Sequence, residues 1–172
     1  MIISLIGYMG SGKSHISKLL SQKINFKLID LDHQIILKHQ KKISEIFTEH
    51  GEIFFRKEEK SVLEDILKLD NDIVLSLGGG TPVYYNNMDL IKSKSKSVFL
   101  QASVSTLTDR LLRQKAKRPL IARLPDEDLP EFIAKHLFER NAFYNRAEFI
   151  INTNNKSPED IVDEIMLALD LK

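Results

Sequence analysis

The 172-residue chain contains no cysteine and no tryptophan. The lack of cysteine excludes disulfides, thiolate-ligated zinc sites and cysteine nucleophiles. It is compatible with a reducing compartment, and we expect a cytoplasmic protein. An excess of charge is missing as well, because 25 Lys and Arg residues stand against 24 Asp and Glu residues, for a net charge of +1. This balance indicates neither a nucleic acid nor a membrane as partner, so we expect any positive field to be confined to a cleft.

Long apolar runs are also absent. The run at residues 1–6 is too short for a signal sequence, and no later run is long enough to span a bilayer. The five histidines lack metal-ligand spacing, and we find no serine–histidine hydrolase signature. Nothing in the sequence demands a protein partner, so we expect a monomer, with residues 1–172 forming a single domain.

Apolar runs alternate with segments of helical period, which predicts an α/β protein with a parallel sheet covered on both faces. The expected strands are Ile2–Ile6, Phe26–Ile29, Ile73–Leu77, Ser97–Leu100 and Phe149–Ile151. Helices are expected at Lys13–Lys23, over most of 33–69 with breaks near Ser44 and Gly51, in part of Asn86–Ser93, at Ser105–Lys115, at Leu129–Tyr144 and from Ser157 to about Leu169. Residues 116–130 predict a long surface loop. Ligands bind beyond the carboxyl ends of parallel strands, so the first three strands should end at one cleft.

The segment Gly7-Tyr8-Met9-Gly10-Ser11-Gly12-Lys13-Ser14 follows the first expected strand and opens the first expected helix. This is the phosphate-binding loop pattern in the strand–loop–helix setting that the pattern requires. Its glycines let backbone N–H groups point at phosphate oxygens, and the helix start adds the positive end of its dipole. Lys13 is predicted to reach the outer phosphates, and the Ser14 hydroxyl to ligate Mg²⁺. The segment therefore predicts binding of a nucleoside triphosphate.

Asp30 and Asp32 follow the second expected strand. Side chains two residues apart on an extended strand point the same way, which suggests one carboxylate for the water shell of a metal and one for a substrate hydroxyl. The alternative is a turn and a helix cap, where Asp is also favoured.

Three further groups are candidates for the cleft. Arg56 and Glu59 lie three apart on one helix face, so Glu59 can hold a guanidinium suited to gripping a carboxylate. Gly78–Gly80 follow a buried strand, which indicates close backbone approach to a ligand, with a flexible bend as the alternative. Arg118 lies in the long loop, where it could close over phosphates or simply belong to a solvated basic patch. Arg140 and Arg146 are six residues apart, so at most one of them should face the cleft.

The motifs occur in an ordered set: GYMGSGKS at 7–14, LIDLD at 28–32, IFTEHGEIFFRKEE at 46–59, SLGGG at 76–80, KRPLI at 117–121 and ERNAFY at 139–144. This set resembles the shikimate kinase family over essentially the whole chain. The resemblance implies a three-layer α/β/α fold of the nucleoside monophosphate kinase type, with a five-stranded parallel sheet of order 2-3-1-4-5. It also implies a helical substrate-binding region at about 32–60 and a lid at about 112–128.

The resemblance further implies transfer of a phosphoryl group from ATP, with Mg²⁺, to the 3-hydroxyl of shikimate, on the route to chorismate and aromatic amino acids. It implies catalytic roles for Lys13, Asp32 and Arg118, and metal roles for Ser14 and Asp30. The implied nucleotide-binding residues are Gly10, Ser11, Gly12, Lys13, Ser14, His15, Arg110, Arg118 and Lys156. The implied substrate-binding residues are Asp32, Arg56, Gly78, Gly79, Gly80, Arg140, Phe47 and Phe55.

The sequence departs from the family pattern in three places. His15 stands where the family usually has Thr, Lys156 falls near a position where some members place an adenine-contacting Arg, and the segment after Ile121 is longer and more acidic than the pattern. Rival interpretations are a gluconate or antibiotic-modifying kinase, a GTP switch and a regulatory domain without catalysis. An acceptor lacking a carboxylate would leave Arg56 and Arg140 unexplained. A switch would require a guanine-reading Asn-Lys-x-Asp, and the nearest approach, at Asn155–Pro158, lacks the acid.

Overall fold

Five short strands form one parallel sheet in the order β2-β3-β1-β4-β5. The structure is a computed structural model and describes residues 1–171. The strands are β1 (Ile2–Ile6), β2 (Lys27–Asp30), β3 (Ile73–Ser76), β4 (Lys96–Gln101) and β5 (Phe149–Asn152). The central strand β1 is buried throughout, as expected for a strand covered on both faces. The predicted sheet order is confirmed.

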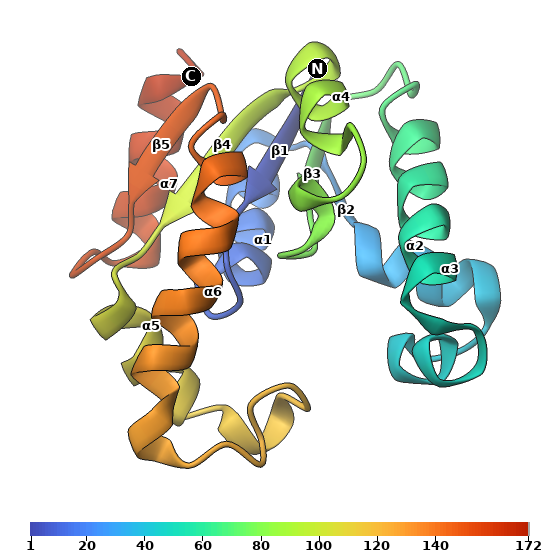
Figure 1. Cartoon of the computed structure of the whole chain (residues 1–172). Helices are drawn as coiled ribbons and strands as arrows, with labels where there is room; N and C mark the ends of the chain where they lie inside the picture. The colour runs from blue at the N-terminus through green and yellow to red at the C-terminus, as the bar shows by residue number, and fades with distance from the viewer. Residues whose placement is uncertain (172) are drawn as a thin grey trace.

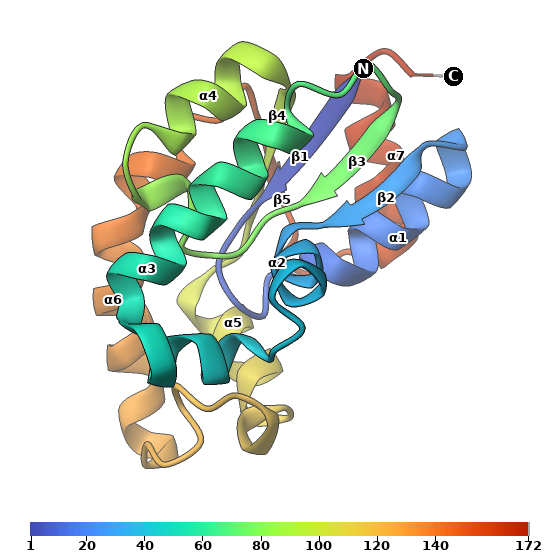
Figure 2. The ribbon, with the colours of Figure 1, turned by 90° about the vertical axis from the view of Figure 1, so that its right-hand side faces the viewer.

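Helices cover both faces of the sheet (Figures 1 and 2). On one face lie α1 (Lys13–Ile24) and α7 (Pro158–Ala168), and on the other lie α3 (Ile43–Ile66), α4 (Asn87–Lys94) and α6 (Leu129–Tyr144). Two more helices, α2 (Leu31–His39) and α5 (Val104–Leu112), pack against α3 and α6 respectively. Alternate residues of β1 enter separate apolar clusters, with Ile3 and Leu5 in one and Ile2 and Ile6 in the other. This gives the predicted three layers.

The register brings the carboxyl ends of three strands to one edge. Ser76 is paired with Leu5 of β1 on one side and with Asp30 of β2 on the other. The loops after β1, β2 and β3 therefore leave the sheet side by side, as the sequence predicts.

The structure corrects the expected placement of Asp32. Only Asp30 belongs to β2, while Asp32 lies in the first turn of α2. The reason is a helix cap, because Asp30 is the N-cap residue and its Oδ1 accepts a hydrogen bond from the His33 N–H at 3.0 Å. Both carboxylates still line the same cavity.

The segment expected to be a long loop is more structured than its composition suggests. Short 3₁₀ helices occupy Lys115–Lys117 and Asp126–Asp128, and between them Ile121 is fully buried in the larger apolar cluster. Ile121, together with the partly buried Leu124, thus packs the segment onto the core. Among residues 1–171, no helix has both the length and the apolar character needed to cross a membrane.

Candidate active site

The loop between β1 and α1 has the backbone of an anion site. Gly10 and Gly12 have φ values of 80° and 96°, in the left-handed region that glycine adopts without steric cost. Gly12 occupies the N-cap position of α1, and the first turn that follows contains no acidic residue. The helix start therefore leaves its N–H groups and its dipole to a ligand at the cavity that Gly12, Lys13 and Ser14 line.

The cavity beside this loop has a volume of about 360 Å³ and opens at the carboxyl edge of the sheet. Its lining comes from the phosphate loop, the ends of β2 and β3, α5 and the segment after α5. The predicted site residues in this lining are Gly10, Gly12, Lys13, Ser14, His15, Asp30, Asp32, Gly78, Gly79, Arg110 and Arg118. Residues that are far apart in the sequence thus line one cavity, at the carboxyl ends of the strands, where the sequence predicted a cleft.

Lys13 and Asp32 face this cavity with perturbed pKa values. Burial lowers the pKa of Lys13 to about 8, and its Nζ donates to the carbonyls of Gly7 at 2.7 Å and Tyr8 at 2.9 Å. Burial and the nearby charges of Asp30 and Glu59 raise the pKa of Asp32 to about 6. Both shifts are those of charged groups placed in a desolvated cleft, where functional groups cluster.

Two arginines reach the nucleotide side of the cavity. Arg110, on α5, donates to the carbonyls of Gly10 and Ser11, both at 3.3 Å, and to the Thr153 carbonyl at 3.2 Å, so it joins the phosphate loop to the end of β5. Arg118 lies in the segment after α5, where its Nη2 contacts Gln114 Oε1 at 3.5 Å. Its charge contributes to the lowered pKa of Lys13.

Two of the predicted nucleotide-binding residues are placed differently. Ser11 is only 2% exposed, its hydroxyl lies next to Gly7, and it does not line the cavity. Lys156 pairs with Glu164 of α7 and is not part of the cavity lining among residues 1–171. A role for Lys156 at adenine stays a prediction.

Each glycine of the Gly78–Gly80 loop is approached by a charged group. A methyl group added to Gly78 would lie 3.2 Å from Asp32 Oδ1, and one on Gly79 would lie 3.3 Å from Arg140 Nη1. On Gly80 it would lie 2.8 Å from both terminal nitrogens of Arg56. The absence of side chains on this loop therefore leaves room for these charged groups close to the backbone, most tightly for Arg56 at Gly80, and the two arginines approach neighbouring residues.

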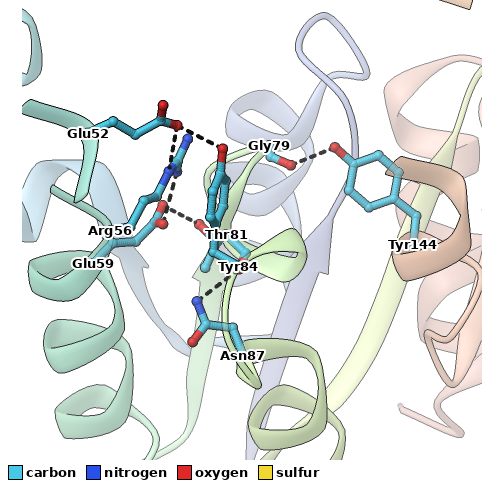
Figure 3. A network of polar contacts seen from close by, with 8 residues as sticks. All are labelled: Glu52, Arg56, Glu59, Gly79, Thr81, Tyr84, Asn87 and Tyr144. Carbon is cyan, nitrogen blue, oxygen red and sulfur yellow. Dashed lines mark hydrogen bonds and ion pairs between the residues drawn. The ribbon is translucent and has the colours of Figure 1, made fainter. Parts of the chain in front are cut away.

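Arg56 is held by a buried carboxylate. Its Nη1 donates to Glu59 Oε2 at 3.0 Å, while the other oxygen of Glu59 accepts from the Thr81 hydroxyl at 2.7 Å (Figure 3). Glu59 is only 1% exposed. Burial alone would lower the pKa of Arg56, but the pairing with Glu59 outweighs it and raises the pKa. The interaction expected from the spacing of Arg56 and Glu59 is present.

Arg140 and Arg146 behave as their spacing predicts. Arg140 comes from α6 and faces Gly79 and the ring of Tyr8, whose centroid lies 5.8 Å from the guanidinium carbon. Arg146 follows the end of α6 and pairs with the exposed Asp89. Of Arg140 and Arg146, Arg140 is therefore the one that approaches the glycine loop.

Several residues around the site were not singled out from the sequence. Tyr144 donates to the Gly79 carbonyl at 2.6 Å, and Tyr8 hydrogen-bonds His136 Nδ1 at 2.8 Å. Tyr84 packs on Arg56. Phe47 and Phe55, which the family resemblance did single out, pack together with centroids 4.6 Å apart. Tyr144 is the last residue of the ERNAFY motif, so the motif could have indicated that Tyr144 belongs to the site. Tyr84 has no such signal, because its contact depends on how the chain turns after Gly80.

The fold is a sheet of order 2-3-1-4-5 with a phosphate loop after its central strand, and Asp32, Arg140 and Arg56 gather at the Gly78–Gly80 loop; Arg140 and Arg56 do not line the cavity itself. These features define a P-loop kinase of the nucleoside monophosphate kinase type. The particular family follows from comparison with known proteins. The family model described as shikimate kinase matches residues 9–170, and the chain belongs to the shikimate kinase family. It is accordingly an ATP-dependent kinase of the shikimate pathway.

The relatives cover the chain almost completely. A curated shikimate kinase of Flavobacterium psychrophilum is 48% identical over 164 residues, which are 95% of each chain. The crystal structure of shikimate kinase from Bacteroides thetaiotaomicron superposes with a TM-score of 0.92 at 35% identity, covering 99% of each chain. Shikimate kinase from Acinetobacter baumannii, solved in complex with shikimate, has a TM-score of 0.86 at 30% identity, covering 98% of this chain and 93% of that one.

Proposed function

We propose that this chain transfers the γ-phosphoryl group of ATP to the 3-hydroxyl of shikimate, giving shikimate 3-phosphate and ADP. One observation carries the choice of acceptor: Asp32, Arg140 and Arg56 approach successive glycines of the Gly78–Gly80 loop. A carboxylate is suited to orienting a hydroxyl, and two guanidinium groups are suited to a carboxylate. Shikimate carries both groups on one ring, against which we expect Phe47 and Phe55 to pack.

Asp32 and Lys13 are the groups that we expect to act at the reacting atoms. The loose transition state of phosphoryl transfer requires alignment and charge stabilisation more than covalent chemistry. Asp32 would orient the acceptor hydroxyl and accept its proton. Lys13 would leave its contacts with the Gly7 and Tyr8 carbonyls and bind the outer phosphates, and Arg118 would reach them from the lid.

The residues that line the cavity also fit Mg²⁺. This ion takes oxygen ligands and keeps several waters, so it binds through a few protein oxygens together with substrate phosphates. The Ser14 hydroxyl and Asp30 supply such oxygens, and the bond to the His33 N–H engages only one oxygen of Asp30. When bound, Mg²⁺ neutralises charge on the transferred phosphoryl group.

A coupled assay of ADP release tests the proposal with shikimate, gluconate and water as alternative acceptors. We expect turnover that depends on shikimate. Arg56→Ala should raise the KM for shikimate roughly 10- to 100-fold, as expected for loss of a charged hydrogen-bonded pair, with little change in the KM for ATP. ADP release that depends on gluconate and ignores shikimate would refute the proposal.

Two controls separate carboxylate binding from damage to the fold. Arg56→Lys keeps the charge beside the buried Glu59 but loses the planar fork, so it should show an intermediate KM. The methyl ester of shikimate lacks the carboxylate and should be a poor acceptor for the parent enzyme. Its KM should be nearly the same for the parent and Arg56→Ala. If Arg56→Ala instead raises the KM for ATP alone, the assignment of Arg56 to the acceptor is wrong.

We also propose that the enzyme acts as a monomer in the cytoplasm. The sequence contains no feature that demands a protein partner, and the absence of cysteine is compatible with a reducing compartment. Sedimentation at micromolar concentration should give the mass of one 19.8 kDa chain. A sedimenting dimer would overturn the monomer.

A further inference from the structure

Tyr84 stacks on the arginine of the acceptor site. It follows the short 3₁₀ helix at Thr81–Val83, where extended backbone (φ −95°, ψ 145°) turns its ring back towards α3. The Arg56 guanidinium carbon lies 4.0 Å from the centroid of this ring, within the range of a cation–π contact (Figure 3). The Arg56 side chain is 13% exposed, so much of this contact is shielded from water.

Glu52 holds both partners of this stack. Its Oε1 accepts a hydrogen bond from the Tyr84 hydroxyl at 2.7 Å and lies 3.4 Å from Arg56 Nε. The hydrogen bond from Tyr84, followed by the charge of Arg56, lowers the pKa of Glu52, which therefore stays ionised. Glu52 and Arg56 lie one helical turn apart on α3, while Tyr84 belongs to the loop after β3, so the triad joins two elements of the site.

The contacts that Arg56 makes with Glu52, Tyr84 and Glu59 leave some of its N–H donors available to a ligand. Of the five N–H groups of a guanidinium, Nε points to Glu52 and one N–H of Nη1 points to Glu59. The remaining three, one on Nη1 and two on Nη2, have no acceptor among residues 1–171. Both terminal nitrogens lie next to Gly80. The Tyr84 ring lies against the guanidinium while its hydroxyl donates to Glu52, so Tyr84 restrains the Arg56 side chain.

We propose that Tyr84, anchored by Glu52, is a positioning residue that orients the Arg56 guanidinium for the carboxylate of the acceptor; this rests on the proposed function. A free arginine side chain loses rotamer freedom when it binds a ligand, and a guanidinium already held in place loses less. Tyr84 thus acts on acceptor affinity through Arg56 and has no part in nucleotide binding.

Steady-state kinetics of three variants test this role. Tyr84→Leu removes the stack and the hydrogen bond, and should raise the KM for shikimate roughly tenfold, the scale of a shielded cation–π contact. Tyr84→Phe and Glu52→Gln keep the ring but weaken the anchor, and each should raise this KM by about two- to threefold. In all three, kcat and the KM for ATP should stay within about twofold of the parent, because a positioning residue for the acceptor does not touch the nucleotide.

Tyr85 supplies a matched control. It is the next residue along, is 52% exposed, and places its ring 5.4 Å from the Lys60 ammonium instead of on Arg56. Tyr85→Asn removes an aromatic ring from the same loop, and Asn tolerates the backbone there (φ 52°). This variant should keep the parent KM for shikimate. Thermal unfolding of every variant shows whether any of them is misfolded. If Tyr84→Leu is misfolded, the KM values of Tyr84→Phe and Glu52→Gln decide whether the proposal holds.

A double-mutant cycle separates action through Arg56 from a general effect on the loop. In an Arg56→Ala background, Tyr84→Leu should raise the KM for shikimate no further, because the group that it positions is gone. The proposal is overturned if the factor is the same in both backgrounds, if the KM for ATP rises equally, or if none of the three variants changes the KM for shikimate. A parent enzyme that does not use shikimate would instead refute the proposed function, before any variant is compared.

Discussion

At the scale of single residues, burial has moved the pKa values of Lys13 and Asp32 towards each other. The pKa of the ammonium falls to about 8 and that of the carboxyl rises to about 6. The two groups sit in one cavity, and the charge of each favours the ionised form of the other, although burial is the larger effect for both. Between these values both are ionised, which is the state that the proposed mechanism requires.

The pH dependence of kcat/KM should therefore be bell-shaped. We expect an acid limb near pH 6, where Asp32 becomes protonated, and a basic limb near pH 8, where free Lys13 loses its proton. Initial rates at subsaturating substrate across pH 5 to about 9.5 measure both limbs. A profile that stays flat through pH 6 would show that Asp32 need not be ionised for the reaction.

Asp32 should also lower the stability of the protein at neutral pH. Its pKa is raised in the folded state, so its contribution to stability is fully present below the unfolded pKa and is lost as pH rises through about 6. Asp32→Asn, which cannot ionise, should therefore raise the free energy of unfolding at pH 8 by up to about 3 kcal/mol while turnover falls. Urea unfolding followed by circular dichroism measures this at pH 8 and at pH 4, where the gain should largely disappear. An equal gain at both pH values would attribute it to packing instead of charge.

The sequence located most candidate site residues because their chemistry is local. The phosphate loop, Asp32, Arg56 and Arg118 are recognisable from spacing and from the strand or helix beside them. The contacts of Tyr84 and Tyr144 depend on tertiary placement, because their partners lie 28 and 65 positions away. No periodicity in the chain predicts which ring will face which group at such a separation.

At the scale of elements, α3 contains a glycine, Gly51, whose backbone conformation would be strained for any other amino acid. Gly51 has φ 81° and ψ 174°, inside a segment that otherwise runs as helix from Ile43 to Ile66. This backbone region is essentially restricted to glycine. The kink separates the turns that carry Phe47 from those that carry Phe55 and Arg56, and so lets both phenylalanines meet.

Gly51→Ala should destabilise the protein by about 1–3 kcal/mol through backbone strain alone. Steric clash does not contribute, because a methyl group there would have no atom within 4 Å among residues 1–171. Lys57→Ala, an exposed substitution on the same helix, is the control and should change stability by about 0.5 kcal/mol or less. Urea unfolding measures both. Equal midpoints for Gly51→Ala and the parent would mean that the kink carries no strain for alanine.

The ends of helices were harder to predict than their existence. A break was expected near Ser44, but α2 ends at His39 and α3 begins after Lys42. The reason is local bonding: the Glu45 side chain accepts from the Lys42 N–H at 2.7 Å, and Gln40 takes a left-handed backbone (φ 54°). Apolar periodicity reports which residues face the core and says little about which residue caps a helix.

At the scale of the whole molecule, the phosphate loop is attached to the centre of the sheet. It continues β1, which is hydrogen-bonded to β3 on one side and to β4 on the other. Its neighbour Asp30 ends the edge strand β2, and Arg110 links the loop to the end of β5. Each of the five strands is therefore connected to the nucleotide site, either by the chain itself or by hydrogen bonds to a neighbouring strand or to Arg110.

This connection predicts that ATP stabilises the chain as one unit. Thermal unfolding should show a single transition, and MgATP at 100 times its Kd should add about 2.7 kcal/mol to the free energy of unfolding. Far-ultraviolet circular dichroism is the suitable probe, since the chain has no tryptophan. Lys13→Ala should abolish most of the shift while keeping the single transition. Two transitions, of which MgATP moves only one, would mean that the segment after α5 or the α2–α3 region unfolds separately from the sheet, and the prediction of one domain over residues 1–172 would be wrong.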